Sequence, residues 1–128
     1  MASLSEMELY SKTVYAEARG EPHEGQRWVA WVIKNRAHVG RFGGHSIKEV
    51  CLKPKQFSCW NGKTDIAIYE PGIYRNIQVL CEEIHRAPIS ADPTDKSLYY
   101  INPDLCDPAW AKKLKKTRKI GHHQFFKE

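Results

Sequence analysis

The sequence predicts an α+β fold that is mostly helical, with a small β-sheet formed late in the chain. Apolar residues recur at spacings of three and four in several long segments, which is typical of amphipathic helices. Short runs of strand composition occur only in the last third of the chain. A length of 128 residues suits one domain, residues 1–128, with enough buried surface for one core.

The first half of the sequence predicts three helices. Ser3 and Ser5 each have a glutamate three residues later, the capping-box pattern, and the helix that follows ends near Gly20. A second helix is expected over 25–37; it is apolar over much of its circumference, so we expect it to run through the core. A short capped helix is expected over 46–53, where a proline stops it.

The second half predicts two more helices and two strands. A helix over 73–87 ends before a proline, and 97–101 has strand composition. An aspartate followed by proline starts a helix over 107–120, which Gly121 ends. Residues 123–126 are expected to form a last strand.

The chain carries a formal net charge of +5, and residues 112–119 hold six of its basic side chains without an acidic one. A solvated helix face and a contact with a polyanion are both open interpretations of this run. No nucleic-acid-binding signature accompanies it, so we expect no nucleic-acid partner. There is no apolar run long enough for membrane insertion, and residues 1–6 lack the pattern of a secretory signal.

Four cysteines, Cys51, Cys59, Cys81 and Cys106, allow three pairings, and the sequence does not choose among them. Two disulfides and four reduced thiols are both compatible with the sequence. No pair has the C-x-x-C spacing of zinc or thioredoxin-like sites. We expect neither a metal nor a cofactor.

The string over 15–21, YAEARGE, is the strongest chemical signal in the sequence. Glu17 falls near the C-terminal end of a helix, where the helix dipole disfavours a carboxylate, and close to the buried stripe. Such a side chain is either paired to a cation such as Arg19 or Arg36, or held with a raised pKa. A raised pKa suits a general acid, and a structural ion pair is the alternative.

Five strings occur along the chain in a specific order and spacing. They are VYAEARGEPHEGQRWVAWVIKNR (14–36), VC (50–51), QFSCW (56–60), LYYINP (98–103) and IGHHQFF (120–126). Together they resemble the cell-wall hydrolase family of the spore-cortex-lytic enzymes, over about residues 10–126. The resemblance implies a catalytic domain related in layout to lysozymes and lytic transglycosylases. It also implies cleavage of peptidoglycan between N-acetylmuramic acid and N-acetylglucosamine, with Glu17 as the catalytic acid.

The number of carboxylates bears on the mechanism. Hydrolytic glycosidases use two, whereas a lytic transglycosylase needs one. Glu21 is separated from the helix of Glu17 by glycine and flanked by proline, and the loop residues Asp65 and Glu70 are weaker candidates. We therefore expect a one-glutamate lytic transglycosylase. A hydrolytic N-acetylmuramidase and a non-catalytic module that binds wall glycan are the alternatives.

Further substrate contacts are expected from residues that match the family strings or offer sugar-binding groups. These are Tyr15, Arg19, Glu21, Gln56, Phe57, Ser58, Tyr99, Tyr100, Asn102 and His123. For Arg19 a clamp on Glu21 is favoured, and His123 is expected to hold the C-terminal strand. Tyr99 and Tyr100 should point to opposite faces of a strand, one of them toward the cleft. For the others a packing or turn role stays open.

The expected partner is the peptidoglycan glycan strand, bound by a monomer that acts on the cell wall, outside a cell or after release from a phage or cell. We expect the catalytic domain to occupy residues 1–128, which would leave no room in them for a separate wall-binding module. The positive charge is therefore a candidate substitute for such a module.

Overall fold

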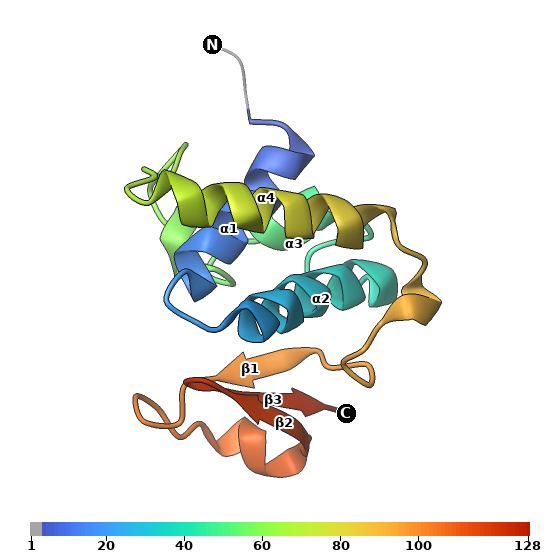
Figure 1. The fold of residues 1–128 in the computed structure, drawn as a ribbon. Coiled ribbons are helices and arrows are strands. Elements are labelled where there is room, and N and C mark those ends of the chain that lie inside the picture. The colour runs from blue at the N-terminus through green and yellow to red at the C-terminus, as the bar shows by residue number, and fades with distance from the viewer. Residues whose placement is uncertain (1–3) are drawn as a thin grey trace.

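The computed structural model describes residues 4–128 and stacks a layer of helices on a small sheet (Figure 1). The four α-helices are α1 (Glu6–Ala18), α2 (His23–Val39), α3 (Ile47–Leu52) and α4 (Pro71–Arg86). In Figure 1, α2 runs between the sheet below and α1 and α4 above. The expected α+β class, mostly helical with a late sheet, is confirmed.

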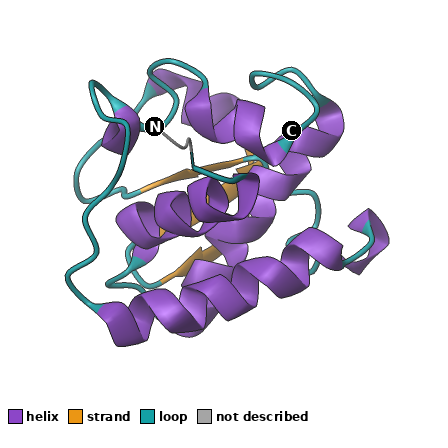
Figure 2. Cartoon of the chain, turned by 90° about the horizontal axis from the view of Figure 1, so that it is seen from above, coloured by secondary structure: helices purple, strands orange, loops and turns teal. Residues whose placement is uncertain are grey.

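The sheet contains β1 (Tyr99–Ile101), β2 (Lys115–Ile120) and β3 (His123–Lys127). The strand order is β1-β3-β2 and both pairings are antiparallel, so β3 is the central strand. Seen from above in Figure 2, the strands lie beneath the helices. Three short 3-10 helices complete the chain: Ser58–Trp60, Ile89–Ala91 and Ala109–Lys113.

Helix α2 is the centre of the core, as its apolar circumference predicts. Tyr10 of α1 is fully buried and donates a hydrogen bond from its hydroxyl to the Ala30 carbonyl at 2.6 Å. On the opposite face of α2, the Trp28 ring lies 5.2 Å from the ring of Phe125 in β3. These contacts join both layers to α2.

Local signals begin α1 and α3 where the sequence predicts them, whereas α2 and α4 begin two residues earlier than expected and lack a side-chain cap. Ser5 accepts from the Glu8 amide while the Glu8 carboxylate accepts from the Ser5 amide, a complete capping box. Ser46 likewise accepts from the Glu49 amide at the start of α3. The alternative cap at Ser3 lies outside the described residues.

The helix expected over 107–120 is wrong: the basic run is a short 3-10 helix followed by strand β2. A helix over 112–119 would offer Leu114 as its one apolar side chain, so it would have no face to bury. As a strand, the same residues satisfy the free edge of β3, and tertiary pairing overrides local propensity. Gly121 makes the hairpin turn, with φ of +56°, and does not end a helix.

The four cysteines are free thiols: Cys51 and Cys81 are buried, Cys59 is half-buried and Cys106 is exposed. Of the two states that the sequence left open, the structure therefore contains the reduced one. Among the helices of residues 4–128, none has the length and apolar character needed to cross a membrane.

Candidate active site

Glu17 lies on the last turn of α1, at the junction of the helical layer and the sheet. Its Oε1 accepts a hydrogen bond from the Tyr100 hydroxyl of β1 at 2.5 Å. Burial raises the pKa of Glu17 above its ordinary value of 4.5, although the Tyr100 hydrogen bond and the charge of Arg36 act in the opposite direction. The result is a carboxyl group that keeps its proton at higher pH than an exposed glutamate.

Residues of the neighbouring strand β3 hold the Tyr100 side chain in place. Tyr100 pairs with Phe125 in the β1–β3 register, and their rings lie 5.7 Å apart. The His123 ring packs against Tyr100 at 4.9 Å. Burial and the Glu17 charge raise the Tyr100 pKa well above its ordinary value, so the phenol keeps its proton and remains a donor.

Arg36 of α2 is the cation whose charge acts on the pKa of Glu17. Its Nε donates to the Leu98 carbonyl at 2.8 Å, just before β1. The guanidinium lies over the rings of Phe42 at 4.8 Å and of Phe57 and Tyr99 at 5.7 Å. Three aromatic rings therefore hold the Arg36 guanidinium where its charge interacts with the Glu17 carboxyl group.

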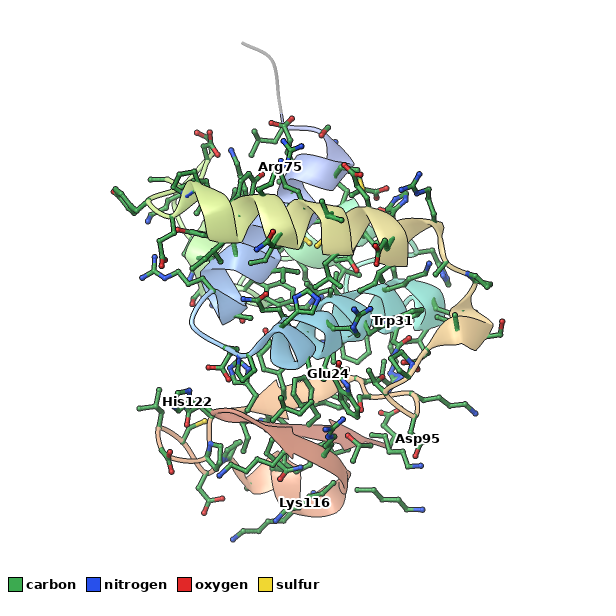
Figure 3. All side chains as sticks on the ribbon, viewed as in Figure 1. Glu24, Trp31, Arg75, Asp95, Lys116 and His122 are labelled. Carbon is green, nitrogen blue, oxygen red and sulfur yellow. The ribbon has the colours of Figure 1, made fainter. Side chains whose placement is uncertain are left out.

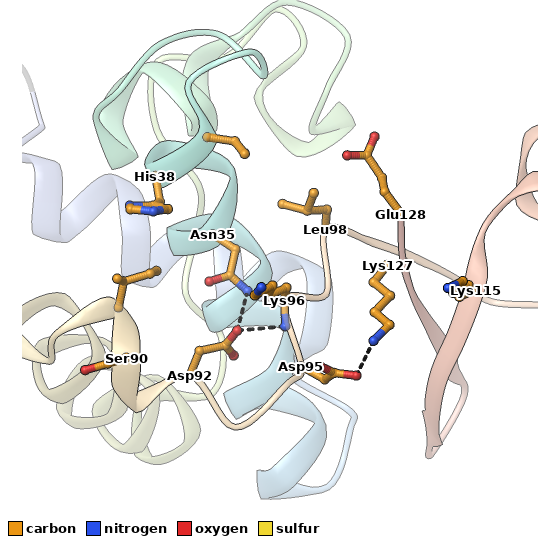
Figure 4. Close-up of a pocket in the computed structure, with 12 residues that line it drawn as sticks. Asn35, His38, Ser90, Asp92, Asp95, Lys96, Leu98, Lys115, Lys127 and Glu128 are labelled. Carbon is orange, nitrogen blue, oxygen red and sulfur yellow. Dashed lines mark hydrogen bonds and ion pairs between the residues drawn. The ribbon is translucent and has the colours of Figure 1, made fainter.

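The preceding residue of α2 anchors the same stretch of chain. The Asn35 amide donates to the Ser97 carbonyl at 3.0 Å and to the Asp92 carboxylate at 3.1 Å. Asp92 in turn accepts from the Lys96 amide at 2.9 Å, which closes the loop that leads to β1 (Figure 4). Consecutive residues of α2 thus set the position from which β1 presents Tyr100.

A cavity of about 680 Å³ lies beside this loop (Figure 4). Its wall includes Asn35, Asp92 and the Asp95–Lys127 ion pair, and it contains none of the site residues predicted from the sequence. The cavity is therefore separate from the surroundings of Glu17.

Glu21 does not pair with Arg19, so the predicted clamp is wrong. Helix α1 ends at Ala18, and Glu21 turns toward the β2–β3 hairpin. There it accepts from the backbone amide of His122 at 2.8 Å and contacts the His122 ring at 2.8 Å. Arg19 instead lies 3.6 Å from the Glu70 carboxylate. The turn between α1 and α2 separates the two side chains that the sequence places close together.

Tyr15, Phe57 and Gln56 have structural contacts. Tyr15 is buried, and its hydroxyl accepts from the amides of Tyr69 and Glu70 at the start of α4. Phe57 is buried in the core. The Gln56 amide donates to backbone carbonyls of the neighbouring loop and α3.

The remaining predicted residues lie near β1 or on the surface. Tyr99 and Tyr100 point to opposite faces, as the strand predicts; Tyr99 stacks near Trp110, with ring centroids 5.5 Å apart. The Asn102 side chain accepts from the Asp104 amide in a turn. Ser58 is exposed. His123 is buried in the sheet with its Nδ1 3.8 Å from Glu21, and this nitrogen has no hydrogen-bond partner among residues 4–128.

Sequence reasoning missed the roles of Glu70 and His122 as partners of the YAEARGE string (15–21). Each contact joins residues that are far apart in the chain, 55 positions for Tyr15 and Glu70 and 101 for Glu21 and His122. No local pattern in the sequence could have indicated either one. Within residues 4–128, no group of three His, Cys, Asp or Glu side chains is arranged to hold a metal ion.

The sequence model described as Cell Wall Hydrolase matches residues 20–126 of this chain. The chain belongs to the cell wall hydrolase family. The family expected from the five strings is therefore confirmed. At the level of the family, the expectation of a cell-wall lytic enzyme is confirmed as well. The matched range begins just after Glu17.

Relatives of this cell wall hydrolase cover Glu17 as well. The spore cortex-lytic enzyme of Bacillus subtilis is 33% identical over 96% of this chain, and that of Oceanobacillus iheyensis is 32% identical over 98%. The chain spans 38% and 42% of these two relatives, less than half of each.

Two solved structures share the fold. The catalytic domain of the Bacillus cereus SleB protein has a TM-score of 0.74 at 31% identity, covering 95% of this chain and 89% of that domain. The catalytic domain of the germination-specific lytic transglycosylase SleB from Bacillus anthracis has a TM-score of 0.75 at 30% identity, covering 98% and 97%. The part shared with the longer relatives thus has the fold of these catalytic domains.

Proposed function

We propose that this chain is a catalytic domain that cleaves the glycan strand of peptidoglycan between N-acetylmuramic acid and N-acetylglucosamine. It acts as a lytic transglycosylase, and Glu17 is its acid and base. The observation that carries the proposal is the buried Glu17 carboxyl with a raised pKa, held by the Tyr100 hydroxyl. The family, and the lytic transglycosylase that shares the fold, support the same reaction class.

The reaction needs one carboxyl group in two protonation states. Protonated Glu17 gives its proton to the glycosidic oxygen, and the bond from that oxygen to C1 of the muramyl residue breaks. The resulting Glu17 carboxylate then takes the proton of the muramyl 6-hydroxyl, whose oxygen bonds to C1 and closes a 1,6-anhydro ring. The carboxyl group ends protonated, and no water is consumed.

The surroundings of Glu17 support a mechanism with one carboxylate. Besides burial, Tyr100 and Arg36 are the causes of the Glu17 pKa shift, and no carboxylate of the described residues contributes to it. Glu21 is engaged by His122, and Glu70 by Tyr15 and Arg19. A hydrolytic glycosidase would need a second carboxylate on the far side of the scissile bond.

Tyr100 and Arg36 serve the carboxylate that exists between the two proton transfers. The Tyr100 hydrogen bond and the Arg36 charge both stabilise the ionised form, while burial stabilises the neutral form. The raised pKa favours the protonated acid that starts the reaction, and the two partners stabilise the carboxylate that forms after proton donation. In this proposal Tyr100 also fixes the orientation of the carboxyl group toward the substrate.

Glu17→Gln tests the proposal, because the amide keeps the shape of the side chain but is not an acid. We expect it to digest purified peptidoglycan about 10²- to 10⁴-fold more slowly than the parent protein. Mass spectrometry of the parent's products should show 1,6-anhydromuramyl ends.

Reducing muramyl ends would instead indicate a hydrolytic muramidase, and no fragments a binding module. An equal digestion rate in Glu17→Gln would contradict the role of Glu17. The variant should keep its thermal midpoint at pH 7, because a neutral amide suits the buried position. Loss of activity is then attributable to chemistry and not to unfolding.

A further inference from the structure

Three lysines surround a pocket on the face of the sheet that is turned away from the helices. Lys116 and Lys119 come from β2, and Lys112 comes from the 3-10 helix Ala109–Lys113. In Figure 3, Lys116 lies on the side of the sheet away from the helical layer. The cavity measures about 420 Å³, and its wall is completed by Ile101, Pro103, Asp107, Ala111, Gln124 and Phe126. We refer to Lys112, Lys116 and Lys119 as the rim lysines.

The strand register explains why these side chains share one face. Lys116 lies opposite Phe126, and Lys119 lies opposite Gln124. Residues directly opposite in an antiparallel pair point to the same side of the sheet. A bulge between Lys116 and Arg118 turns the latter to the other face, where its guanidinium lies 5.7 Å from the ring of a tryptophan of α2.

The rim lysines keep an excess of positive charge over the carboxylates that the described residues place around the pocket. Among residues 4–128 the rim lysines form no ion pair, and neither does Asp107, the one carboxylate in the pocket wall. Lys127 on the neighbouring strand, by contrast, is paired with Asp95 at 2.5 Å. The pocket thus has a cationic rim and an apolar floor formed by Ile101, Ala111 and Phe126.

We propose that this pocket binds the stem peptide of peptidoglycan through its free carboxylate, as a wall-binding site outside the surroundings of Glu17. The identity of the polymer rests on the proposed function. Stem-peptide carboxylates supply the negative charge that the rim attracts, and small side chains such as the methyl group of alanine fit an apolar floor of this size. The pocket thus gives the positive charge of the chain a specific ligand.

The position of the pocket relative to Glu17 decides which glycan strand supplies the bound stem peptide. Tyr100 and Ile101 are adjacent in β1 and point to opposite faces of the sheet. Tyr100 reaches Glu17, whereas Ile101 belongs to the pocket floor. The pocket and Glu17 therefore lie on opposite faces of the sheet. The pocket holds the stem peptide of a neighbouring glycan strand while the active site cleaves another glycan strand.

The test measures binding in a Glu17→Gln background, so that the polymer is not degraded during the assay. The protein is sedimented with intact purified peptidoglycan, and in parallel with beads that carry the soluble glycan chains released when an amidase removes the stem peptides. Replacing the rim lysines with glutamine (K112Q, K116Q and K119Q together) should weaken binding to intact peptidoglycan about fivefold or more at low salt. On the beads that carry peptide-free glycan chains the two proteins should bind equally.

A matched control removes the same charge elsewhere. Lys48, Lys53 and Arg75 are exposed and have no ion pair within residues 4–128, so their joint replacement by glutamine lowers the net charge equally. It should weaken binding far less than replacement of the rim lysines. Equal weakening by both sets, or a difference that persists on the peptide-free glycan chains, would overturn the proposal. All the replaced side chains are exposed, and equal thermal midpoints will show that each variant folds.

Failure of this site and failure of the proposed function give different results. A protein with Glu17 intact is also assayed on soluble glycan chains that lack stem peptides. Digestion of these chains at equal rates by the parent and the rim variant keeps the proposed function, whatever the binding assay shows. Absence of digestion by the parent would contradict the function, while the binding comparison still decides whether the pocket recognises stem peptides.

Discussion

At the scale of single residues, the opposing influences on Glu17 are the main feature of the site. Burial raises its pKa, and Tyr100 and Arg36 lower it. A carboxyl group with a raised pKa is protonated below that pKa and loses the proton as the pH rises through it. If protonated Glu17 starts the reaction, activity must decline on the alkaline side of this pKa.

Tyr100→Phe tests this balance. The variant removes a hydrogen bond that stabilises the carboxylate, so the Glu17 pKa rises further and the alkaline decline moves to higher pH. The maximal rate should fall about tenfold, because the carboxylate formed after proton donation loses a charge-assisted hydrogen bond. The measurement is the digestion rate of purified peptidoglycan between pH 4 and 9.

Tyr69→Phe is the matched control, since this tyrosine is 79% exposed and no hydrogen bond of its hydroxyl is found in the described chain. It should reproduce the parent profile. An alkaline limb that stays in place, or moves to lower pH, in Tyr100→Phe would show that this hydroxyl does not act on the Glu17 pKa.

Residue identity alone indicated part of the site. The helix-end position and the nearby apolar stripe marked Glu17 as either a paired carboxylate or a group with a raised pKa, and the family strings made it the candidate acid. Alternation along a strand placed one of Tyr99 and Tyr100 inward. The partner of Arg19 was wrong, because the clamp on Glu21 assumed that neighbours in the sequence remain neighbours in space. The end of α1 at Ala18 turns Glu21 toward the sheet.

At the scale of elements, the turn of the β2–β3 hairpin and the turn between α1 and α2 interlock. Glu21 accepts from the His122 amide, directly after Gly121 in the hairpin turn. Gly121 has a φ of +56°, and a Cβ there would lie 2.6 Å from the Glu21 carboxylate and 2.9 Å from Pro22. The glycine therefore allows both the turn and the close approach of the two segments.

Gly121→Ala should accordingly destabilise the protein by about 1–3 kcal/mol, through left-handed backbone strain and the clash with Glu21. Urea unfolding monitored by circular dichroism measures the effect. Gly72→Ala is the control, because Gly72 lies in the first turn of α4 with open space around it. The control should be neutral or stabilising, and equal stability of the two variants would contradict the interlock.

The basic run shows why an element can differ from its local signals. Asp107 and Pro108 resemble the start of a helix, and Gly121 resembles its end. The backbone groups along the free edge of β3 needed hydrogen-bond partners, and the backbone of the basic segment supplied them. Lysines suit such an edge strand, because they also hinder pairing with a second molecule.

At the scale of the whole molecule, the site lies where two layers meet. Glu17 comes from the helical layer and Tyr100 from the sheet, so the geometry of the proposed acid depends on how the layers are joined. Trp28 and Phe125 make one such contact, and Arg36 and the Leu98 carbonyl make another. The surface of the sheet away from the helices is left for the rim lysines.

The free cysteines allow a test of the whole fold. Burial raises the pKa of Cys51 to about 12 and of Cys59 to about 11, and raises that of Cys81 further. Since Cys106 is the exposed cysteine and the other three are buried or half-buried, Cys106 should be the one thiol that reacts rapidly with a thiol reagent at pH 8. Four thiols should react in urea without prior reduction.

Cys106→Ser should abolish the rapid phase and leave three thiols in urea. Fewer than four reactive thiols in the unfolded, unreduced parent would indicate a disulfide and contradict the structure. A rapid phase that persists in Cys106→Ser would show that a second cysteine is accessible in the folded state.

The sequence by itself determined the features whose causes act over a few residues. A capping box began α1 and a serine N-cap began α3, the spacing of apolar side chains marked the long helices, and the family strings pointed to Glu17 as the candidate acid. The tertiary structure alone decided the strand β2 and the partners of the site. Tyr100 and Glu17 are 83 positions apart, and Glu21 and His122 are 101 apart. Such contacts form only when the layers pack, because the pairing of β3 and the burial of α2 outweigh local propensity.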